Sequence, residues 1–398
     1  MQTIVDLAEY GSRFTVDPYP IYAELREKGP VHRIRSLEGE ELWLVVGYEE
    51  GREALTDPRL SKRPLPVLLG MVEGAGAFSN MLQSDPPQHT RLRKLVTREF
   101  TARRIESMRA GIERVTHELL DAMLAAPDHR ADLVQALAFP LPITVIFQLL
   151  GVPTQDAATL HAWSTDLMTP QSPQAEAEAA QNLGTYLVKL AEDKRVTPGD
   201  DLLSGLVRVV DGEEDMLSQD ELLGMCFLLL IAGHETTINL ISNGARALLQ
   251  NRDQFEALRK DPSLIPGAVE EVLRYDGSVE TSTDRFTTET VEIGGVTIPP
   301  HQKVLIALNA ANRAPERFAD PDRFDIRRDA RGHLAFGHGI HHCLGAPLGR
   351  LEAQIAFRAL VERVPTLELD ADPAELPWVS GLLIRGVRTL PVRWTPTA

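Results

Sequence analysis

The chain has 398 residues, of which 43% are hydrophobic and 25% are charged, as in a soluble globular protein with a sizeable core. Its net charge of −16 argues against a nucleic-acid partner bound through phosphates. Only two cysteines occur, so we expect no disulfide framework and a reducing, cytoplasmic setting.

The chain shows no segment that we expect to enter a membrane. Residues 1–13 include acids and no apolar run, which argues against a signal peptide or an anchor. The longest apolar run, residues 222–233, is too short to span a bilayer. No linker rich in Pro, Gly or Ser divides the chain, so we expect a single domain over residues 1–398, with a helix-rich lobe and a smaller N-terminal β lobe.

The first elements mix short helices with short strands. Residues 17–20 predict a turn that opens a helix through Leu25, and residues 31–34 and 42–46 have the composition of strands. Residues 64–82 hold several Pro and Gly, which predicts a long loop of the kind that often covers a binding site.

A basic helix is predicted after Pro86 and Pro87. It places His89 and Arg93 on one face, at i and i+4. Residues 91–104 carry six basic residues and one acid, a local reversal in an acidic chain. Such a face is suited to carboxylate groups or to an acidic protein, although part of it also fits an ordinary solvated helix.

Four further helices are expected before residue 196. Periodicity predicts helices over 105–125 and 131–151, and the second ends at a Gly-Val-Pro stop. Residues 154–195 predict two helices joined by the breaker-containing stretch 169–173, an arrangement that could cover a cavity.

A long helix follows the capping box formed by Ser218 and Glu221. It is apolar all round over 222–231, which predicts burial, but residues 232–237 (Ala-Gly-His-Glu-Thr-Thr) then place an acid and two hydroxyls near its middle. Burying such groups without partners costs about 1–3 kcal/mol each, so a functional role is the economical interpretation. The alternative is a helix kink whose polar groups are satisfied and carry no chemistry.

Within this stretch, Gly233 allows a flat ligand to approach closely, and Thr236 can bond back to a carbonyl and distort the helix. His234 and Glu235 resemble the start of a His-Glu-x-x-His zinc site, but Ile238 stands at the fifth position and excludes that motif.

Downstream, Glu271 and Arg274 lie at i and i+3 of a predicted helix, a spacing that favours an ion pair. Gly294 and Gly295 predict a hairpin turn within residues 291–299.

The most specific pattern is at residues 336–345, where Cys343 stands between Gly339 and Gly345 and ahead of a helical pattern. The glycines permit a tight turn around the sulfur, and the positive end of the helix favours thiolate over thiol. A thiolate held on one side is suited to the iron of a haem. A zinc cluster with His338, His341 and His342 is the first alternative, but adjacent ligands converge poorly on one tetrahedral ion; an inert buried thiol is the second.

The spacing Phe-x-x-Gly-x-x-x-Cys-x-Gly resembles the haem-thiolate signature of the cytochrome P450s, and the other motifs agree with that family in order and spacing over nearly the whole chain. The resemblance implies a mainly α fold with small β-sheets, a triangular prism with haem b between a long central helix and the cysteine loop. It implies Cys343 as the axial ligand of the haem iron.

The same resemblance assigns further site residues. It implies that Thr236 assists oxygen activation by hydrogen bonding, that Glu235 relays protons, and that Ala232 contacts the haem. It implies a ring of propionate-binding residues: His89, Arg93, Arg285 and His341. It also implies a structural charge lock of Glu271, Arg274 and an arginine before the cysteine loop, with Arg328 the best match and Arg317 the runner-up.

The implied function is a bacterial monooxygenase that hydroxylates or epoxidises an apolar small molecule, such as a polyketide, macrolide, terpenoid or steroid. Electrons would come from a ferredoxin and its NAD(P)H-dependent reductase, because no flavin or iron–sulfur motif is present, and we expect a monomer. Val279 and Leu382 are candidate substrate contacts. The chain departs from the family pattern at His342, where relatives often have an apolar residue, and at Gly349, where Ala is common.

Three other functions stay open at this point. A haem-based gas sensor or carrier would turn nothing over and would leave Glu235 and Thr236 unexplained. A zinc hydrolase would use His338, His341 and Cys343. A peroxygenase would replace the electron donor with hydrogen peroxide.

Overall fold

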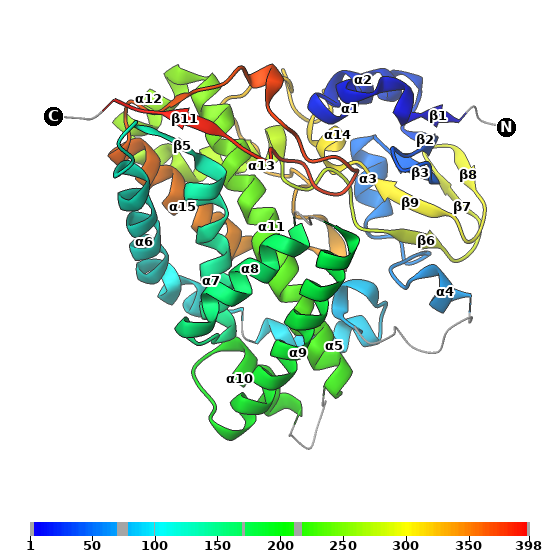
Figure 1. Ribbon diagram of the computed structural model, residues 1–398. Helices are drawn as coiled ribbons and strands as arrows, with labels where there is room; N and C mark the ends of the chain where they lie inside the picture. The colour runs from blue at the N-terminus through cyan, green and yellow to red at the C-terminus, as the bar shows by residue number, and fades with distance from the viewer. Residues whose placement is uncertain (1–3, 70–78, 99, 169–171, 211–216, 396–398) are drawn as a thin grey trace. The chain divides into compact units, whose positions relative to one another are not determined.

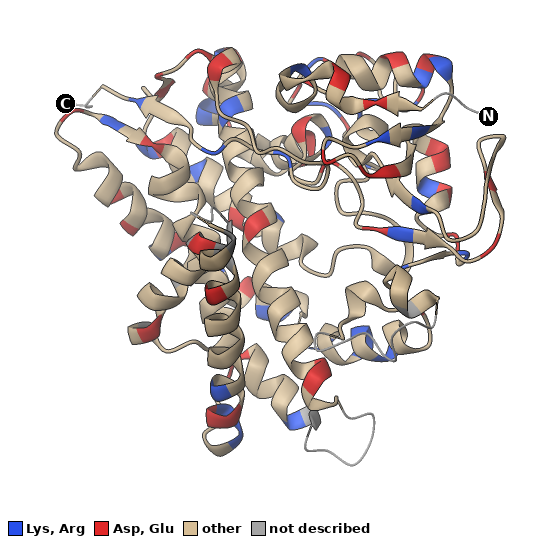
Figure 2. Ribbon diagram, turned by 45° about the vertical axis from the view of Figure 1, so that its right-hand side comes forward, with Lys and Arg blue, Asp and Glu red and all other residues tan. Residues whose placement is uncertain are grey.

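The structure is a computed structural model that describes residues 4–69, 79–98, 100–168, 172–210 and 217–395 (Figure 1). The chain divides into two compact units, which we call the first unit (residues 1–65, 109–140 and 236–398) and the second unit (residues 66–108 and 141–235). The predicted class, mainly α with small β-sheets, is confirmed. Acidic and basic residues are interspersed along the described ribbons (Figure 2).

Over its described residues, the first unit contains three sheets. The largest has the strand order β1-β2-β3-β9-β6-β4, in which β2 pairs antiparallel with β3, and β3 pairs parallel with β9. The predicted strands at 31–34 and 42–46 are confirmed as β2 and β3, and the predicted hairpin is β7–β8, whose two turn glycines have positive φ. The strands are β1 (Val5–Asp6), β2 (Val31–Arg35), β3 (Glu41–Val45), β4 (Leu60–Ser61), β5 (Arg130–Asp132), β6 (Arg285–Thr287), β7 (Val291–Ile293), β8 (Val296–Ile298), β9 (Lys303–Ile306), β10 (Glu368–Leu369) and β11 (Pro391–Arg393).

The helices of the first unit pack on these sheets and on one another through apolar faces. The longest helix that lies wholly in this unit is α15 (Ala346–Arg363), which begins directly after the cysteine loop with a proline in its first turn. The helices are α1 (Ser12–Val16), α2 (Tyr19–Lys28), α3 (Tyr48–Ala54), α12 (Arg252–Lys260), α13 (Ile265–Asp276), α14 (Leu308–Asn312) and α15 (Ala346–Arg363).

The second unit is helical over its described residues. Helix α6 (Ala102–Leu124) begins in it and continues into the first unit, and α11 (Gln219–Gln250) does the same. The remaining helices are α4 (Leu65–Leu68), α5 (Gln88–Thr97), α7 (Pro140–Leu150), α8 (Ala157–Met168), α9 (Pro173–Val196) and α10 (Leu202–Val210).

Two predicted elements need correction. The helix predicted over 131–151 begins instead with β5, because residues 130–132 pair with β11, and a π-helical turn (Val134–Ala138) precedes α7. Pro140 starts α7, where its missing N–H leaves no intrahelical bond unmade. The loop predicted over 64–82 contains the short helix α4, and its residues 70–78 lie outside the described residues, as do 169–171 of the predicted helix connection.

Helix α11 begins as predicted at a reciprocal capping box. The Ser218 N–H donates to Glu221 Oε2 (2.9 Å), and the Glu221 N–H donates to Ser218 Oγ (3.1 Å). Of the described helices, α11 alone is long and apolar enough to cross a membrane. However, 61% of its apolar window is buried inside the protein, as in the core helix of a soluble protein.

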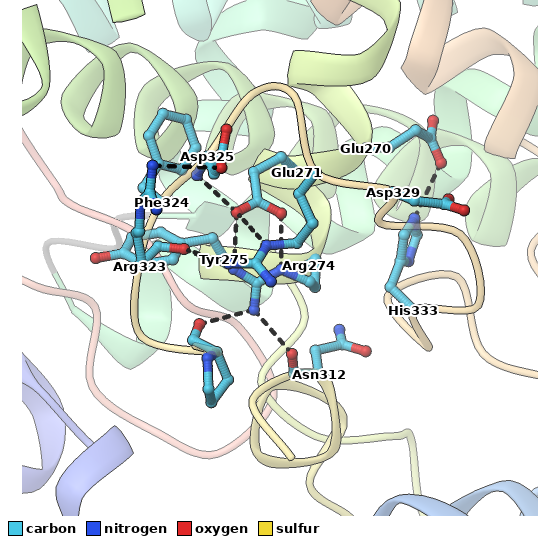
Figure 3. A network of polar contacts seen from close by, with 12 residues as sticks. Glu270, Glu271, Arg274, Tyr275, Asn312, Arg323, Phe324, Asp325, Asp329 and His333 are labelled. Carbon is cyan, nitrogen blue, oxygen red and sulfur yellow. Dashed lines mark hydrogen bonds and ion pairs between the residues drawn. The ribbon is translucent and has the colours of Figure 1, made fainter. Parts of the chain in front are cut away.

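A buried charge cluster ties α13 to the segment before the cysteine loop (Figure 3). Arg274 donates two bonds to Glu271, from Nε to Oε2 (2.7 Å) and from Nη2 to Oε1 (2.8 Å), and neither side chain is exposed. The N–H of Asp325 also donates to Glu271 Oε1 (2.9 Å), and Arg328 Nε lies 3.3 Å from the same oxygen. The three predicted members of the lock therefore lie together, and Arg328 is the third member.

The runner-up for that position, Arg317, is exposed and donates instead to the carbonyl of Arg331. A lone buried charge is costly, so each charge of the cluster depends on its partners.

The end of α13 carries a second buried cluster, which sequence reasoning missed. Asp276 accepts from Tyr19 Oη (2.6 Å) and from Arg385 Nε (2.6 Å), and it also pairs with Arg246. Burial alone would raise the pKa of Asp276, but Arg385 and Arg246 outweigh it and hold this pKa far below its usual range. The cluster joins the N-terminal helix α2, α11, α13 and the C-terminal segment.

We predict that Arg274→Ala lowers the unfolding free energy by about 3–5 kcal/mol, because it leaves the Glu271 carboxylate buried without its main partner. Urea unfolding followed by circular dichroism measures the change. Arg317→Ala is the matched control and should leave the unfolding free energy close to that of the unmutated protein. Equal losses in the two variants would show that the cluster at Glu271 does not hold the fold.

Candidate functional site

The loop over residues 336–345 closes on itself through backbone bonds. The N–H of Cys343 donates to the Phe336 carbonyl (2.8 Å), and the N–H of His342 donates to the Gly339 carbonyl (3.1 Å). Gly337 and Gly339 have φ of 71° and 75°, in the left-handed region that favours glycine. A Cβ at Gly339 would also lie 2.7 Å from Thr56 Cγ2, so this position is doubly restricted to glycine.

The expectation that Gly345 is needed for a tight turn around the sulfur is wrong. Gly345 has φ of −79°, and a Cβ there would lie 3.9 Å from Cys343 Sγ, which is ordinary van der Waals contact. Gly337 instead has a left-handed φ. The motif does not indicate this, because residue 337 is one of its unspecified positions.

The two cysteines differ in a way that decides which can be a ligand. Cys226 is fully buried in α11, and burial raises the pKa of its thiol to about 12. Cys343 is exposed and stands three residues before the first residue of α15. The first N–H groups of a helix lack partners within the helix and carry its positive dipole end, which favours an anion at this place.

The polar middle of α11 separates into structural and exposed groups. His234 is fully buried, with Nδ1 donating to the Leu230 carbonyl (2.6 Å) and Nε2 accepting from Ser164 Oγ (3.0 Å). A Cβ at Gly233 would lie 2.8 Å from Ile146 Cδ1, so the small size of Gly233 serves packing against α7. The small residue that is exposed is Ala232.

The two residues that follow His234 are half-buried. Burial raises the pKa of the Glu235 carboxyl above its usual range, so this group holds a proton more readily than an exposed glutamate does. Thr236 is half-buried as well, and Thr237 is buried.

The four residues predicted to bind propionates are divided between the two units. In the second unit, α5 carries His89, which is buried, and Arg93, which is half-buried. Burial and then the Arg93 charge lower the pKa of His89. In the first unit, Arg285 on β6 is buried, and His341 is half-buried in the cysteine loop. Whether the four form one ring stays a prediction.

The candidate substrate contacts lie where the C-terminal segment meets the residues after α13. Val279 forms a bridge with Ile384 and is partly buried. Leu382 is 8% exposed and packs in a hydrophobic cluster with N-terminal residues, whereas Leu383 is 45% exposed. Leu382 is therefore a packing residue in this structure, and the exposed apolar side chain of this tip is that of Leu383.

The zinc alternative finds no support in the geometry. Among the described residues, which include His338, His341 and Cys343, no three His, Cys, Asp or Glu side chains gather as metal ligands would.

Comparison with known proteins decides the family. The family model described as Cytochrome P450 matches residues 9–383 of the chain. The chain belongs to the cytochrome P450 family. Its members bind haem b through a thiolate ligand, and the chain is a cytochrome P450 monooxygenase in that sense.

Relatives extend the similarity along the whole chain. The chain is 54% identical over 98% of its length to the cytochrome P450 monooxygenase PikC of Streptomyces venezuelae, of which 94% is covered. It is 46% identical over 99% of both chains to 6-deoxyerythronolide B hydroxylase of Saccharopolyspora erythraea. The structure of the tirandamycin C-bound P450 monooxygenase TamI superposes with a TM-score of 0.88 at 46% identity, covering 98% of this chain and 100% of that one.

The residues present fit the haem of a P450. The donor is a single exposed thiol at the start of a helix, as a one-sided iron ligand requires. Arg285 and His341, in the same unit as Cys343, carry donors of the kind that a carboxylate binds.

A further group of residues around the cysteine loop was missed by sequence reasoning. Arg350 and His333 lie against the ring of Phe336, the first residue of the motif, and both bind Glu270. The available signal was the aromatic residue at the start of the motif, which implies a specific environment, but the partners lie on other elements.

Proposed function

We propose that this P450 hydroxylates or epoxidises an apolar macrolide- or polyketide-type small molecule, using O2 and two electrons from a ferredoxin. The observation that carries the proposal is the thiol of Cys343, exposed at the start of α15 in a chain whose family binds haem through a thiolate. Haem b supplies the activation of dioxygen when it is bound.

Cys343 is proposed to hold the iron through Sγ as a thiolate. The start of α15 stabilises the negative charge, and the closure of the loop by the Cys343 N–H fixes the backbone that carries the sulfur. Ala232 is proposed to contact the haem face, because it is small and exposed on α11. His89, Arg93, Arg285 and His341 are proposed to bind the haem propionates by charge-assisted hydrogen bonds.

Thr236 and Glu235 are proposed to manage protons. The Thr236 hydroxyl supplies a hydrogen bond at Oγ1, and the Glu235 carboxyl holds a proton and passes it on, for which its raised pKa is favourable. Both residues are half-buried near the middle of α11. His234, which precedes them, uses both ring nitrogens in hydrogen bonds to Leu230 and Ser164.

The substrate class rests on the relatives. PikC, 6-deoxyerythronolide B hydroxylase and a mycinamicin IV hydroxylase/epoxidase of Micromonospora griseorubida are 54%, 46% and 42% identical to this chain. A vitamin D(3) 25-hydroxylase of Pseudonocardia autotrophica, 45% identical, keeps steroid-like substrates as the second candidate class.

The electron donor is proposed to be an acidic ferredoxin, reduced by an NAD(P)H-dependent reductase. Its docking face would use three basic residues of the stretch 91–104, which reverses the sign of an otherwise acidic chain: Lys94 and Arg103, which are exposed, and Arg104, which is half-exposed. Arg91 pairs with Glu221 and is not counted among them. A cytoplasmic monomer fits this arrangement.

Cys343→Ser should abolish the thiolate-type band in the reduced, CO-bound difference spectrum, because an alcohol is not ionised near neutral pH and is a poor iron ligand. Cys226→Ala is the control and should keep the band, since that thiol is buried in α11. A band that survives the first substitution and disappears in the second would move the ligand to Cys226.

Thr236→Ala should uncouple the reaction, with NAD(P)H consumed and peroxide released, and product formed per NAD(P)H falling at least roughly tenfold. Thr237→Val is the matched control, because it removes the neighbouring hydroxyl at nearly constant volume. Product and peroxide are quantified against NAD(P)H consumption. Unchanged coupling in Thr236→Ala would assign proton management to other residues.

A spectral binding screen tests the substrate class. We expect macrolactones to change the haem spin state with dissociation constants roughly tenfold lower than those of steroids, a difference of about 1.4 kcal/mol. Bound compounds are then incubated with ferredoxin, reductase and NAD(P)H, and the products are identified by mass spectrometry. Tighter binding and turnover of steroids would contradict the macrolide assignment and support the second candidate class.

A further inference from the structure

Glu270 precedes the lock residue Glu271 on α13 and bonds to different partners. Its Oε1 accepts from Arg350 Nε (2.6 Å), and its Oε2 accepts from Arg350 Nη2 (2.9 Å) and from His333 Nε2 (3.1 Å). Figure 3 shows Glu270 and His333 pointing toward one another, apart from the bonds of Glu271. One carboxylate therefore joins α13, α15 and the segment that enters the cysteine loop.

The hydrogen bonds also determine the tautomer of His333. Its Nδ1 accepts the N–H of Ala335 (3.2 Å), so the ring proton is on Nε2 and is donated to Glu270. The imidazole ring thereby connects Glu270 to the backbone one residue before Phe336.

Phe336 is held by the same two residues that bind Glu270. The guanidinium carbon of Arg350 lies 4.5 Å from the centroid of the Phe336 ring, within the range of a cation–π interaction. The ring of His333 lies 6.1 Å from that of Phe336, tilted by 49°. The carbonyl of Phe336 in turn accepts the N–H of Cys343 at 2.8 Å.

The charges of the group support each other at neutral pH. Burial alone would raise the pKa of Glu270, but the bonds from His333 and Arg350 outweigh it and bring this pKa to about 2. The Glu270 carboxylate is thus ionised and binds the Arg350 guanidinium with both oxygens. This bidentate pairing fixes the orientation of the flat guanidinium over the Phe336 ring.

We propose that Glu270, Arg350 and His333 are positioning residues that fix Phe336 and, through its carbonyl, the backbone that orients the sulfur of Cys343. The proposal rests on the assignment of Cys343 as the haem ligand. Neighbouring acids on α13 then have separate tasks: Glu271 stabilises the fold, and Glu270 stabilises the geometry of the cysteine loop.

The test follows the thiolate-type band of the reduced, CO-bound holoenzyme with time. We expect Glu270→Gln and Arg350→Lys to convert this band to the form without thiolate about tenfold faster than the unmutated protein does. Lysine keeps the charge of Arg350 but loses the fork and the flat stacking face. Glu256→Gln on α12 is the matched control, because Glu256 also accepts from two arginines, Arg252 and Arg259, and it should leave the rate unchanged.

The Phe336→Leu variant distinguishes positioning through the Phe336 ring from a general structural role. If Glu270 acts through the ring, Glu270→Gln should add no further acceleration in the Phe336→Leu background. The proposal would be overturned if the two substitutions accelerated the conversion of the band multiplicatively in the double variant. It would also be overturned if Glu256→Gln accelerated the conversion as much as Glu270→Gln does. Either outcome would leave the thiolate-type band of the unmutated protein in place. Failure of the ligand assignment itself would be seen differently, as a thiolate-type band that is retained in Cys343→Ser.

Discussion

The bond from the Cys343 N–H to the Phe336 carbonyl is the constraint on which the rest of the site depends. It closes a loop that needs left-handed φ at Gly337 and Gly339, and it leaves the thiol exposed at the start of α15 instead of buried in a core. A buried thiol such as Cys226 has a raised pKa and stays protonated. Cys343 is exposed next to the start of a helix, a place that favours an anion and therefore suits a thiolate ligand.

Helix α13 connects that loop to the remainder of the first unit through three acids. Glu271 is enclosed with Arg274, Asp276 with Arg385, and Glu270 with Arg350 and His333. Each carboxylate accepts from partners far apart in the chain, so the helix aligns segments that local propensity would not hold together. Because an unpaired buried charge is costly, these clusters favour one arrangement of their segments over alternatives.

The middle of α11 combines two requirements that conflict in an ordinary core helix. His234 is satisfied by Ser164 and a backbone carbonyl, so its polarity is structural. Glu235 and Thr236 are only half-buried, and burial is enough to raise the pKa of the Glu235 carboxyl without removing it from the surface of the helix. A helix that must be apolar to pack can thus present an acid and a hydroxyl to chemistry.

The sequence by itself determined the secondary structure around the site, the capping box of α11, the hairpin turn, the Glu271–Arg274–Arg328 cluster and the family, because each depends on residues at short, fixed spacings or on a matching pattern. It mispredicted the start of the 131–151 helix and the role of Gly345, and it did not show that Leu382 packs in a hydrophobic cluster or that a Cβ at Gly233 would meet Ile146. Only the tertiary structure decided these, together with the partners of Glu270 and Asp276. The physical reason is that strand pairing with β11, contact with Ile146, and ion pairs between residues more than 60 positions apart arise from packing, which no local pattern encodes.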